Sequence, residues 1–134
     1  MDYFPTMLEL AGFKLMPELH KDGVSLVNPI QGKTVERDTL YWHYPHYHGS
    51  MWKPGAAIRV GNWKAVQFYH YGEAELYDLS NDIGERNNLA KSHPEKLKAL
   101  LAKLVSIQKK TSARIPTPNP AYNGNLDLIK AESR

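Results

Sequence analysis

Four short stretches rich in β-branched, aromatic and alternating apolar residues follow one another in the middle of the chain, at 39–44, 57–60, 63–69 and 75–79. Residues of this kind favour strands, and turn-forming residues separate the stretches. Gly61-Asn62, between the second and third stretches, suits a two-residue hairpin turn that needs positive φ. Because short connections join antiparallel neighbours, the pattern predicts a four-stranded antiparallel sheet with one buried face.

A long amphipathic helix is expected over 93–111, where it would cover that face. Ser92, with Glu95 three residues later, predicts a capping box at the helix start, and Pro94 suits the first turn. Apolar residues recur at helical spacing and predict a single core-facing stripe: Leu97, Leu100, Leu101, Leu104, Val105 and Ile107. A small sheet packed against one long C-terminal helix is an α+β fold.

The N-terminal part of the chain has a different pattern. Asp2 as a cap and Pro5 in the first turn predict a short, strongly apolar helix that ends at Gly12. A helix of this length is marginal in water by itself, so we expect it to bury its apolar surface against a larger body. The residues that follow predict an irregular connector, with a tight turn at Asp22-Gly23 and one helical turn at 26–30.

A polar corner follows the last stretch of the sheet pattern. The alternation ends at Leu79, and a run of polar residues with Gly84 then breaks the strand. Asp78 and Asp82 have short side chains that accept hydrogen bonds from nearby backbone N–H groups, as in Asx turns. We therefore expect these two carboxylates to stabilise the turn and not to act as acid and base.

This corner resembles the C-terminal signature of the sulfatases, the sulfuric ester hydrolases: a Glu-Leu-Tyr-Asp-Leu run, a polar turn, and Asn-Leu-Ala before a helix that starts with Pro-Glu. Three further pieces fit the same family in the same order, at 2–12, 22–26 and 37–47. The resemblance covers most of this chain but only the last part of a sulfatase. It implies that 1–33 is the end of a large α/β catalytic domain with its connector, 34–122 a C-terminal subdomain of sheet and helix, and 123–134 a tail.

The resemblance also implies a catalytic chemistry. Sulfatases use a formylglycine made from Cys or Ser in a Cys/Ser-x-Pro-x-Arg motif, and they hold calcium with Asp and Asn side chains. This chain has no cysteine, and Ser112-Ala113-Arg114-Ile115-Pro116 has the wrong order for the motif. We therefore expect no catalytic residue, metal site or cofactor in this fragment and no activity of the fragment alone. Calcium and formylglycine are expected in the full-length parent enzyme.

Candidate substrate contacts lie in the aromatic, histidine-rich segment 42–52. In the sulfatases the loop after the first C-terminal strand approaches the catalytic pocket, so the resemblance implies substrate-binding roles for His43, His46, Tyr47 and Trp52. The plainer interpretation is aromatic packing at the end of a sheet. A metal site that uses His43 and His46 is disfavoured, because an extended backbone sends residues three apart to opposite faces.

Two arginines are further candidates. Arg37 and Arg59 each carry a guanidinium that can fork onto sulfate or carboxylate oxygens. An arginine at a strand end is more often solvated or ion-paired, and we favour this structural role for both.

Composition limits the expected partners. The net charge is +3 and the basic residues are spread along the chain, so no nucleic-acid partner is expected. No apolar run approaches the roughly 20 residues of a membrane helix. The expected partners are the upstream catalytic domain of the same polypeptide and a sulfated substrate, with a carbohydrate as one option. The isolated fragment is expected to self-associate through apolar surface of its first helix. Because sulfatases are commonly exported or lysosomal, the resemblance implies an extracytoplasmic location.

Two alternatives stay open. The first is the tail of a related phosphonate or phosphate monoester hydrolase. The second is a free-standing carbohydrate-binding or interaction module, in which Trp42, Tyr47 and Trp52 stack on sugar rings. Sugar binding by the isolated chain would favour the second alternative.

Overall fold

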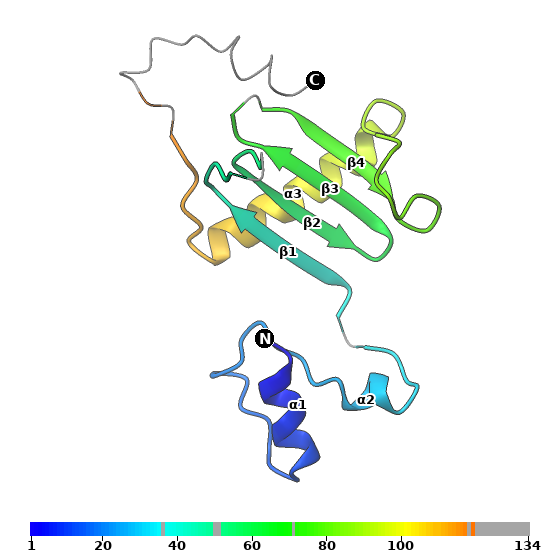
Figure 1. Ribbon diagram of the computed structural model, residues 1–134, viewed down its shortest axis with the longest axis vertical. Coiled ribbons are helices and arrows are strands. Elements are labelled where there is room, and N and C mark those ends of the chain that lie inside the picture. Colours follow the sequence, from blue (N-terminus) through cyan, green and yellow to red (C-terminus); the bar gives the residue numbers. More distant parts are fainter. Residues whose placement is uncertain (36, 50–51, 71, 118, 120–134) are drawn as a thin grey trace. The chain divides into compact units, whose positions relative to one another are not determined.

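The structure is a computed structural model that describes residues 1–35, 37–49, 52–70, 72–117 and 119. The chain divides into two compact units, Met1–Leu40 and a second one that begins at Tyr41 (Figure 1). The limits 1–33, 34–122 and 123–134 stay predictions, and the last of these segments lies outside the described residues. Within the described part of the chain, every helix is too short or too polar to cross a membrane.

The second unit is built on a four-stranded sheet with the strand order β1-β2-β3-β4 (Figure 1). β3 pairs antiparallel with both of its neighbours, and the strand arrows in Figure 1 alternate in direction across the sheet. The predicted antiparallel sheet is therefore confirmed. The strands are β1 (Thr39–Tyr44), β2 (Gly55–Val60), β3 (Trp63–Phe68) and β4 (Ala74–Asp78).

The hairpin of β2 and β3 turns where the sequence predicts. Val60 pairs with Trp63, so Gly61 and Asn62 form the two-residue connection. Gly61 has a φ of +58°, which a residue with a Cβ adopts only at a cost. The Asn62 carbonyl accepts a hydrogen bond from the N–H of Leu79 at 2.8 Å, which ties the turn to the end of β4.

Helix α3 (Pro94–Lys110) packs across one face of this sheet (Figure 1). Ile58 of β2, Leu76 of β4 and Leu104 of α3 are fully buried in the core between the two layers. Val105, which the sequence placed in the apolar stripe, is 40 % exposed, because it lies about 100° around the helix from Leu104. The remaining buried core residues are Ala56, Ala65 and Leu100, and the helix adds Leu97, Leu101 and Ile107 at the edges of the core.

The predicted capping box at the start of α3 is wrong. The N-cap residue is His93, and among the described residues no side chain caps the helix. Ser92 lies one position too early, and its hydroxyl donates to the Leu89 carbonyl at 3.1 Å. Pro94 occupies the first helical position, as expected.

Helix α3 ends in a Schellman motif whose left-handed residue is a serine. Ser112 has a φ of +52°. Its N–H donates to the Lys109 carbonyl at 3.2 Å, and the N–H of Ala113 donates to the Gln108 carbonyl at 2.9 Å. These bonds satisfy carbonyls that the end of a helix leaves unpaired and fix the direction in which the next segment departs.

The first unit holds two helices, α1 (Tyr3–Leu10) and α2 (Val27–Ile30). Each is followed by a glycine with positive φ, Gly12 and Gly32, and Gly12 is the stop that the sequence predicts. Apolar surface of this unit is widely exposed, in keeping with the expectation that α1 packs against a larger body. The large apolar side chains of this unit that are at least 60 % exposed are Met1, Tyr3, Met7, Leu10, Phe13, Leu19 and Ile30.

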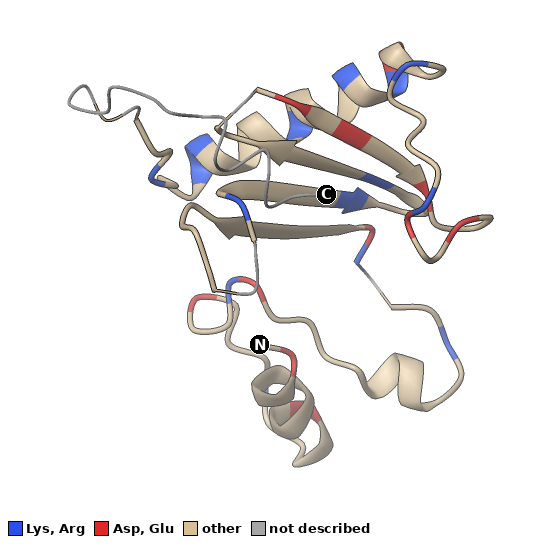
Figure 2. Cartoon of the chain, turned by 45° about the horizontal axis from the view of Figure 1, so that its top comes forward, with Lys and Arg blue, Asp and Glu red and all other residues tan. Residues whose placement is uncertain are grey.

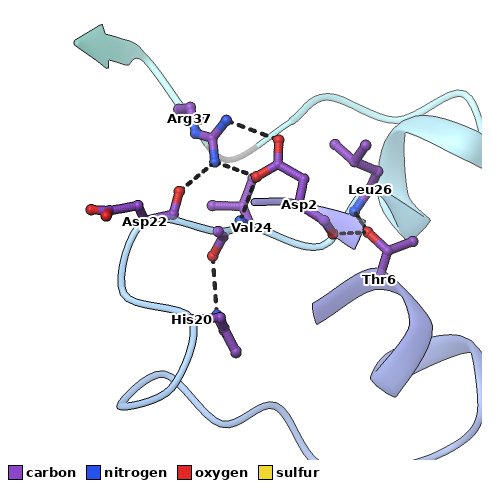
Figure 3. Close-up of polar contacts among 8 residues, drawn as sticks. Asp2, Thr6, His20, Asp22, Val24, Leu26 and Arg37 are labelled. Carbon is purple, nitrogen blue, oxygen red and sulfur yellow. Dashed lines mark hydrogen bonds and ion pairs between the residues drawn. The ribbon is translucent and has the colours of Figure 1, made fainter. Parts of the chain in front are cut away.

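The first unit is held together by Asp2, whose side chain does not cap α1 as predicted (Figure 3). Arg37 forks onto both carboxylate oxygens of Asp2 at 2.6 and 3.0 Å, and it also donates to the Asp22 carbonyl at 2.8 Å. The N–H of Val24 donates to the same carboxylate at 3.1 Å. The hydrogen bond from Arg37 lowers the pKa of Asp2. Asp2 therefore joins the start of α1 to the segment that precedes β1.

The turn at Asp22-Gly23 is confirmed, since the N–H of Gly23 donates to the His20 carbonyl at 2.9 Å. This glycine is needed for close approach. A Cβ added to Gly23 would lie 2.7 Å from the carbonyl oxygen of Met1, which is closer than carbon and oxygen can pack.

Replacing Asp2 by Ala should loosen the first unit, because Arg37 loses its ion partner and the Val24 N–H loses its acceptor. A hydrogen bond to a charged group contributes about 1.5–3 kcal/mol, and the opening free energy of the Val24 amide in hydrogen exchange should fall by this order. Asp22→Ala is the matched control, because Asp22 gives this network its backbone carbonyl. Equal exchange in both variants would contradict the role of Asp2.

Lowering the pH of the solution below the lowered pKa of Asp2 should also remove this stabilisation, since protonation discharges the carboxylate.

Leu104→Ala should lower the free energy of unfolding of the second unit by about 2–5 kcal/mol, because it opens a cavity between α3 and the sheet. Val105→Ala, one residue further along the helix, should change it by less than about 0.5 kcal/mol. Denaturant unfolding followed by circular dichroism measures both values. Equal losses would show that α3 packs through a different face.

Candidate functional site

The face of the sheet opposite α3 carries an aromatic-lined hollow. Because side chains alternate along β1, Tyr41 and His43 lie toward α3, and Trp42 and Tyr44 lie on the other face. A hollow of about 530 Å³ opens on this other face, a volume within the range of small-molecule sites. Its walls and floor include Trp42, Tyr44, His48, Trp52, Gly55, Ala57 and Lys64.

This face also buries apolar side chains of its own. Ala57, Val66 and Tyr77 form a second cluster with Phe68 and Leu79 beside them. An antiparallel sheet with one layer of helix commonly presents polar side chains on its second face. Here Trp42 is 49 % and Trp52 38 % exposed beside the buried cluster. This face of the sheet, called the open face below, is therefore suited to contact with another apolar surface or with a ligand that packs against aromatic rings.

Backbone and side-chain contacts hold the described residues of the loop after β1. The N–H of His48 donates to the Trp52 carbonyl at 3.2 Å. The Tyr47 hydroxyl and Nδ1 of His70 are 2.7 Å apart, which ties the loop to the connection between β3 and β4. The ring of Trp52 lies 6.3 Å from that of Phe68. Trp52, which lines the hollow, is thus held by contacts with His48 and Phe68.

The predicted substrate contacts separate into three positions. Trp52 lines the hollow. His46 lies beside the hollow, its ring edge to face with Tyr44 at 5.6 Å, and Tyr47 is bonded to His70. His43 lies on the α3 side of β1, away from the other three. Trp42, which the sequence offered as a sugar-stacking residue of the alternative module, also lines the hollow, and Tyr44, His48 and Lys64 were missed as contacts. The alternation of residues along β1 was the signal that could have found Trp42 and Tyr44.

His43 makes two hydrogen bonds within the second unit. Its Nδ1 lies 2.7 Å from the Tyr69 hydroxyl, and its Nε2 lies 3.1 Å from the Arg114 carbonyl. The imidazole also stacks on the ring of Tyr41, with an interplanar angle of 12°. Both ring nitrogens are therefore engaged. The substrate-binding role of His43 stays a prediction, as do those of His46, Tyr47 and Trp52.

Lys64 is the charged side chain at the floor of the hollow, and its charge is paired. Its Nζ lies 2.6 and 2.8 Å from the two carboxylate oxygens of Glu85 in the corner after β4. Beside this pair the Tyr77 hydroxyl donates to Glu75 at 3.0 Å. Burial, together with that carboxylate, raises the pKa of Tyr77 to about 12. The hollow consequently offers aromatic surface more than unpaired positive charge.

Acidic side chains collect on β4 and the corner that follows it, whereas lysines lie along α3 (Figure 2). In the corner, Asp78 accepts hydrogen bonds from the N–H and hydroxyl of Ser80, and Asp82 accepts from the N–H groups of Arg86 and Asn87. The hydrogen bond from the Ser80 hydroxyl is the main cause that lowers the pKa of Asp78. The predicted role of both carboxylates in the turn is confirmed.

The same corner covers part of the edge of the sheet. Asn88 accepts hydrogen bonds from the N–H groups of Leu76 and Ala90, at 3.2 and 2.9 Å. The N–H of Leu89 donates to the Leu76 carbonyl at 2.8 Å. β4 is an edge strand, and such pairing occupies backbone groups that could otherwise join another chain.

The two candidate arginines have structural roles in the described residues. Arg37 pairs with Asp2, and Nε of Arg59 donates to the Gly61 carbonyl at 2.8 Å. Across the described ranges, no three His, Asp or Glu side chains converge in a way that could hold a metal ion.

Residues 1–111 match the family model described as N-sulphoglucosamine sulphohydrolase, C-terminal. The chain belongs to this family of sulfatase C-terminal regions. The predicted family is therefore confirmed, and with it the α+β arrangement of sheet, long C-terminal helix and short N-terminal helix.

The relatives that match are several times longer than the part they share with this chain. A sulfatase of Formosa agariphila is 36 % identical over 104 residues, which cover 70 % of this chain and 19 % of the relative. The structure of a 2-O GAG sulfatase superposes with a TM-score of 0.69 at 27 % identity, over 84 % of this chain and 25 % of that one. A protein solved in complex with its substrate D-glucosamine-2-N,6-O-disulfate superposes with a TM-score of 0.66 at 31 % identity. The match covers 86 % of this chain and 24 % of that one. This chain thus spans about a fifth to a quarter of their length.

Alkaline titration should destabilise the open face of the sheet. The pKa of the Tyr77 phenol is about 12 in the folded protein and lies near its usual value of 10 in the unfolded chain. Between these two values the unfolded state releases the proton and the folded state keeps it, so stability is full below pH 10 and falls as the pH rises toward 12. Tyr77→Phe should flatten this part of the pH dependence in denaturant unfolding. An unchanged slope in this variant would contradict the assignment.

Proposed function

We propose that this chain is the C-terminal subdomain of a sulfatase, in which it buttresses the catalytic domain and forms one wall of the pocket where a sulfate ester is hydrolysed. The observation that carries the proposal is the aromatic hollow on the open sheet face. This face lies opposite the helix that buries the core, so it is the surface of the second unit best suited to a partner.

The proposed occupant of the open face is the upstream catalytic domain of the same polypeptide. Relatives are four to five times longer than the matched part, which supports a large neighbouring domain. Exposed apolar side chains on α1, such as Tyr3 and Met7, support a second contact of the same kind. If that domain is missing, these surfaces are free to associate with other copies of the chain.

The proposed substrate is a sulfated sugar. Trp42 and Trp52 present ring surface at the hollow, and aromatic rings stack on the apolar faces of sugars. The relative solved with D-glucosamine-2-N,6-O-disulfate supports this class. Because Lys64 is neutralised by Glu85, we assign the contact with the sulfate group to the upstream domain and contact with the sugar to this wall.

The nucleophile and the metal are assigned to the upstream domain as well. The residues of this chain do not fit either group: cysteine is absent from the sequence, no serine is followed by x-Pro-x-Arg, and the described His, Asp and Glu side chains form no metal-binding set. Formylglycine and calcium are therefore proposed for the parent enzyme alone. By itself this chain is expected to be inactive, and the parent is expected outside the cytoplasm.

A second candidate function uses the same hollow. The exposed Trp42 and Trp52 would also suit a free-standing carbohydrate-binding module. Titration of this chain with plain and sulfated glucosamine oligosaccharides distinguishes the two functions. Binding to the chain alone favours the module, and binding that requires the upstream domain favours the wall of a sulfatase pocket.

In the protein encoded by the complete reading frame, Trp52→Ala should raise the KM for a sulfated glucosamine substrate by up to about tenfold, with a smaller change in kcat. The reason is that an aromatic contact worth about 0.5–1.5 kcal/mol is lost from ground state and transition state alike. Val105→Ala, on the exposed side of α3, is the control and should leave both constants unchanged.

Two results would contradict the proposed function. The first is an unchanged KM in both Trp52→Ala and Trp42→Ala. The second is turnover of 4-methylumbelliferyl sulfate by this chain alone, since it would place the nucleophile within these residues.

A further inference from the structure

Three hydrogen bonds connect α3, the end of β3, β1 and the segment after α3. Nε2 of Gln108 donates to the Tyr69 hydroxyl at 2.8 Å. The Tyr69 hydroxyl lies 2.7 Å from Nδ1 of His43, and Nε2 of His43 lies 3.1 Å from the Arg114 carbonyl. A side-chain amide in α3 is thus connected to a backbone carbonyl six residues later through a tyrosine and a histidine.

The partners in this chain of bonds fix the tautomer of His43. A backbone carbonyl only accepts, so Nε2 of His43 must carry the proton that it donates to Arg114. In the neutral ring Nδ1 is then an acceptor, and the Tyr69 hydroxyl donates to it. The Tyr69 oxygen accepts from Gln108 at the same time. Each of the three hydrogen bonds then has one donor and one acceptor, whereas the opposite tautomer would leave Nε2 without a proton for Arg114.

Burial makes the Gln108–Tyr69 end of the arrangement costly to break. Gln108 is only 7 % exposed, although it is polar, so its amide needs a partner inside the protein. Burial also raises the pKa of Tyr69 to about 12, so its hydroxyl remains a donor even in mildly alkaline solution. His43 is held between two rings, stacked on Tyr41 and edge to face with Tyr69.

The backbone after α3 meets the same residues. The Gln108 carbonyl accepts the N–H of Ala113 in the Schellman motif, while the Gln108 side chain begins the hydrogen-bonded chain. Ser112 is left-handed, which sends Ala113 and Arg114 off the helix axis. Arg114 is therefore placed from one side by the helix end and from the other by His43.

We propose that His43 is a positioning residue that latches the segment after α3 to β1 through the Arg114 carbonyl. The latch consists of Gln108, Tyr69, His43 and the Arg114 carbonyl. It sets the point at which residues 115–117 leave the domain. It also steadies the strand whose other face carries Trp42 and Tyr44 at the hollow. The latch is a property of this chain and holds whether or not the proposed sulfatase function is correct.

Trypsin tests the latch directly, because it cleaves after Arg114, whose carbonyl is the last acceptor. In His43→Ala the rate of cleavage at Arg114 should rise about five- to tenfold, the change that loss of one hydrogen bond of about 1–1.4 kcal/mol produces when cleavage follows local opening. His43→Gln should restore much of the protection, because its side-chain amide can donate from the position of Nε2. His46→Ala is the matched control and should cleave like the wild type.

Cleavage after Lys98 inside α3 reports global unfolding in the same digest. A faster rate of cleavage at Arg114 in His43→Ala, without a faster rate at Lys98, supports the latch. Equal rates at Arg114 in wild type, His43→Ala and His43→Gln would overturn it. If His43→Ala unfolds, His43→Gln is compared with Tyr69→Phe. Protection of Arg114 in His43→Gln together with faster cleavage at Arg114 in Tyr69→Phe supports the latch. Faster cleavage at Arg114 in His43→Gln together with protection in Tyr69→Phe overturns it.

The tautomer provides a signature that a merely space-filling histidine would not give. Long-range ¹H–¹⁵N spectra of the wild-type chain should show His43 as the Nε2–H tautomer, and Tyr69→Phe should keep this tautomer, because the Arg114 carbonyl still accepts the Nε2 proton. An Nδ1–H tautomer in the wild type would overturn the latch.

Discussion

The packing of α3 on one face of the sheet is the constraint on which the rest of the second unit depends. Leu104 and Leu100 of the helix fill the space over Ile58 and Leu76, and this contact decides which residues of each strand are interior. Because side chains alternate along a strand, the choice of face for the core also determines what the opposite face displays. On β1 this puts Trp42 and Tyr44 outside the core.

The two faces consequently give neighbouring histidines different surroundings. His43 lies on the core side, where the Tyr69 hydroxyl and the Arg114 carbonyl occupy its two ring nitrogens. His48, in the loop after β1, borders the hollow. A cluster that looks uniform in sequence therefore splits between a structural network and a candidate contact surface. Position on the sheet, and not residue type, separates these roles.

Much of the fold could be predicted from local pattern. Period-two alternation located the strands, Gly61-Asn62 located a hairpin, and the helical period located α3, because each signal arises within a few residues. The family resemblance rested on short runs of residues and was confirmed.

Contacts between distant residues could not be read from the sequence in the same way. Asp2 looked like a helix cap, yet its carboxylate binds Arg37, which is 35 positions away. The bond from His43 to Arg114 spans 71 positions. Ser92 had the right spacing for a capping box, but a shift of one residue in the helix start gave its hydroxyl another acceptor. The hollow needed residues from three strands and a loop.

The central claim is that the open sheet face is covered by an upstream catalytic domain. Hydroxyl-radical footprinting of Trp42 and Trp52 measures this most directly, in this chain and in the protein encoded by the complete reading frame. Both rings should react in this chain and be protected at least severalfold in the longer protein, while Val105 on α3 reacts equally in both. Equal reactivity of Trp42 and Trp52 in the two proteins, or a reading frame that does not extend upstream, would contradict it.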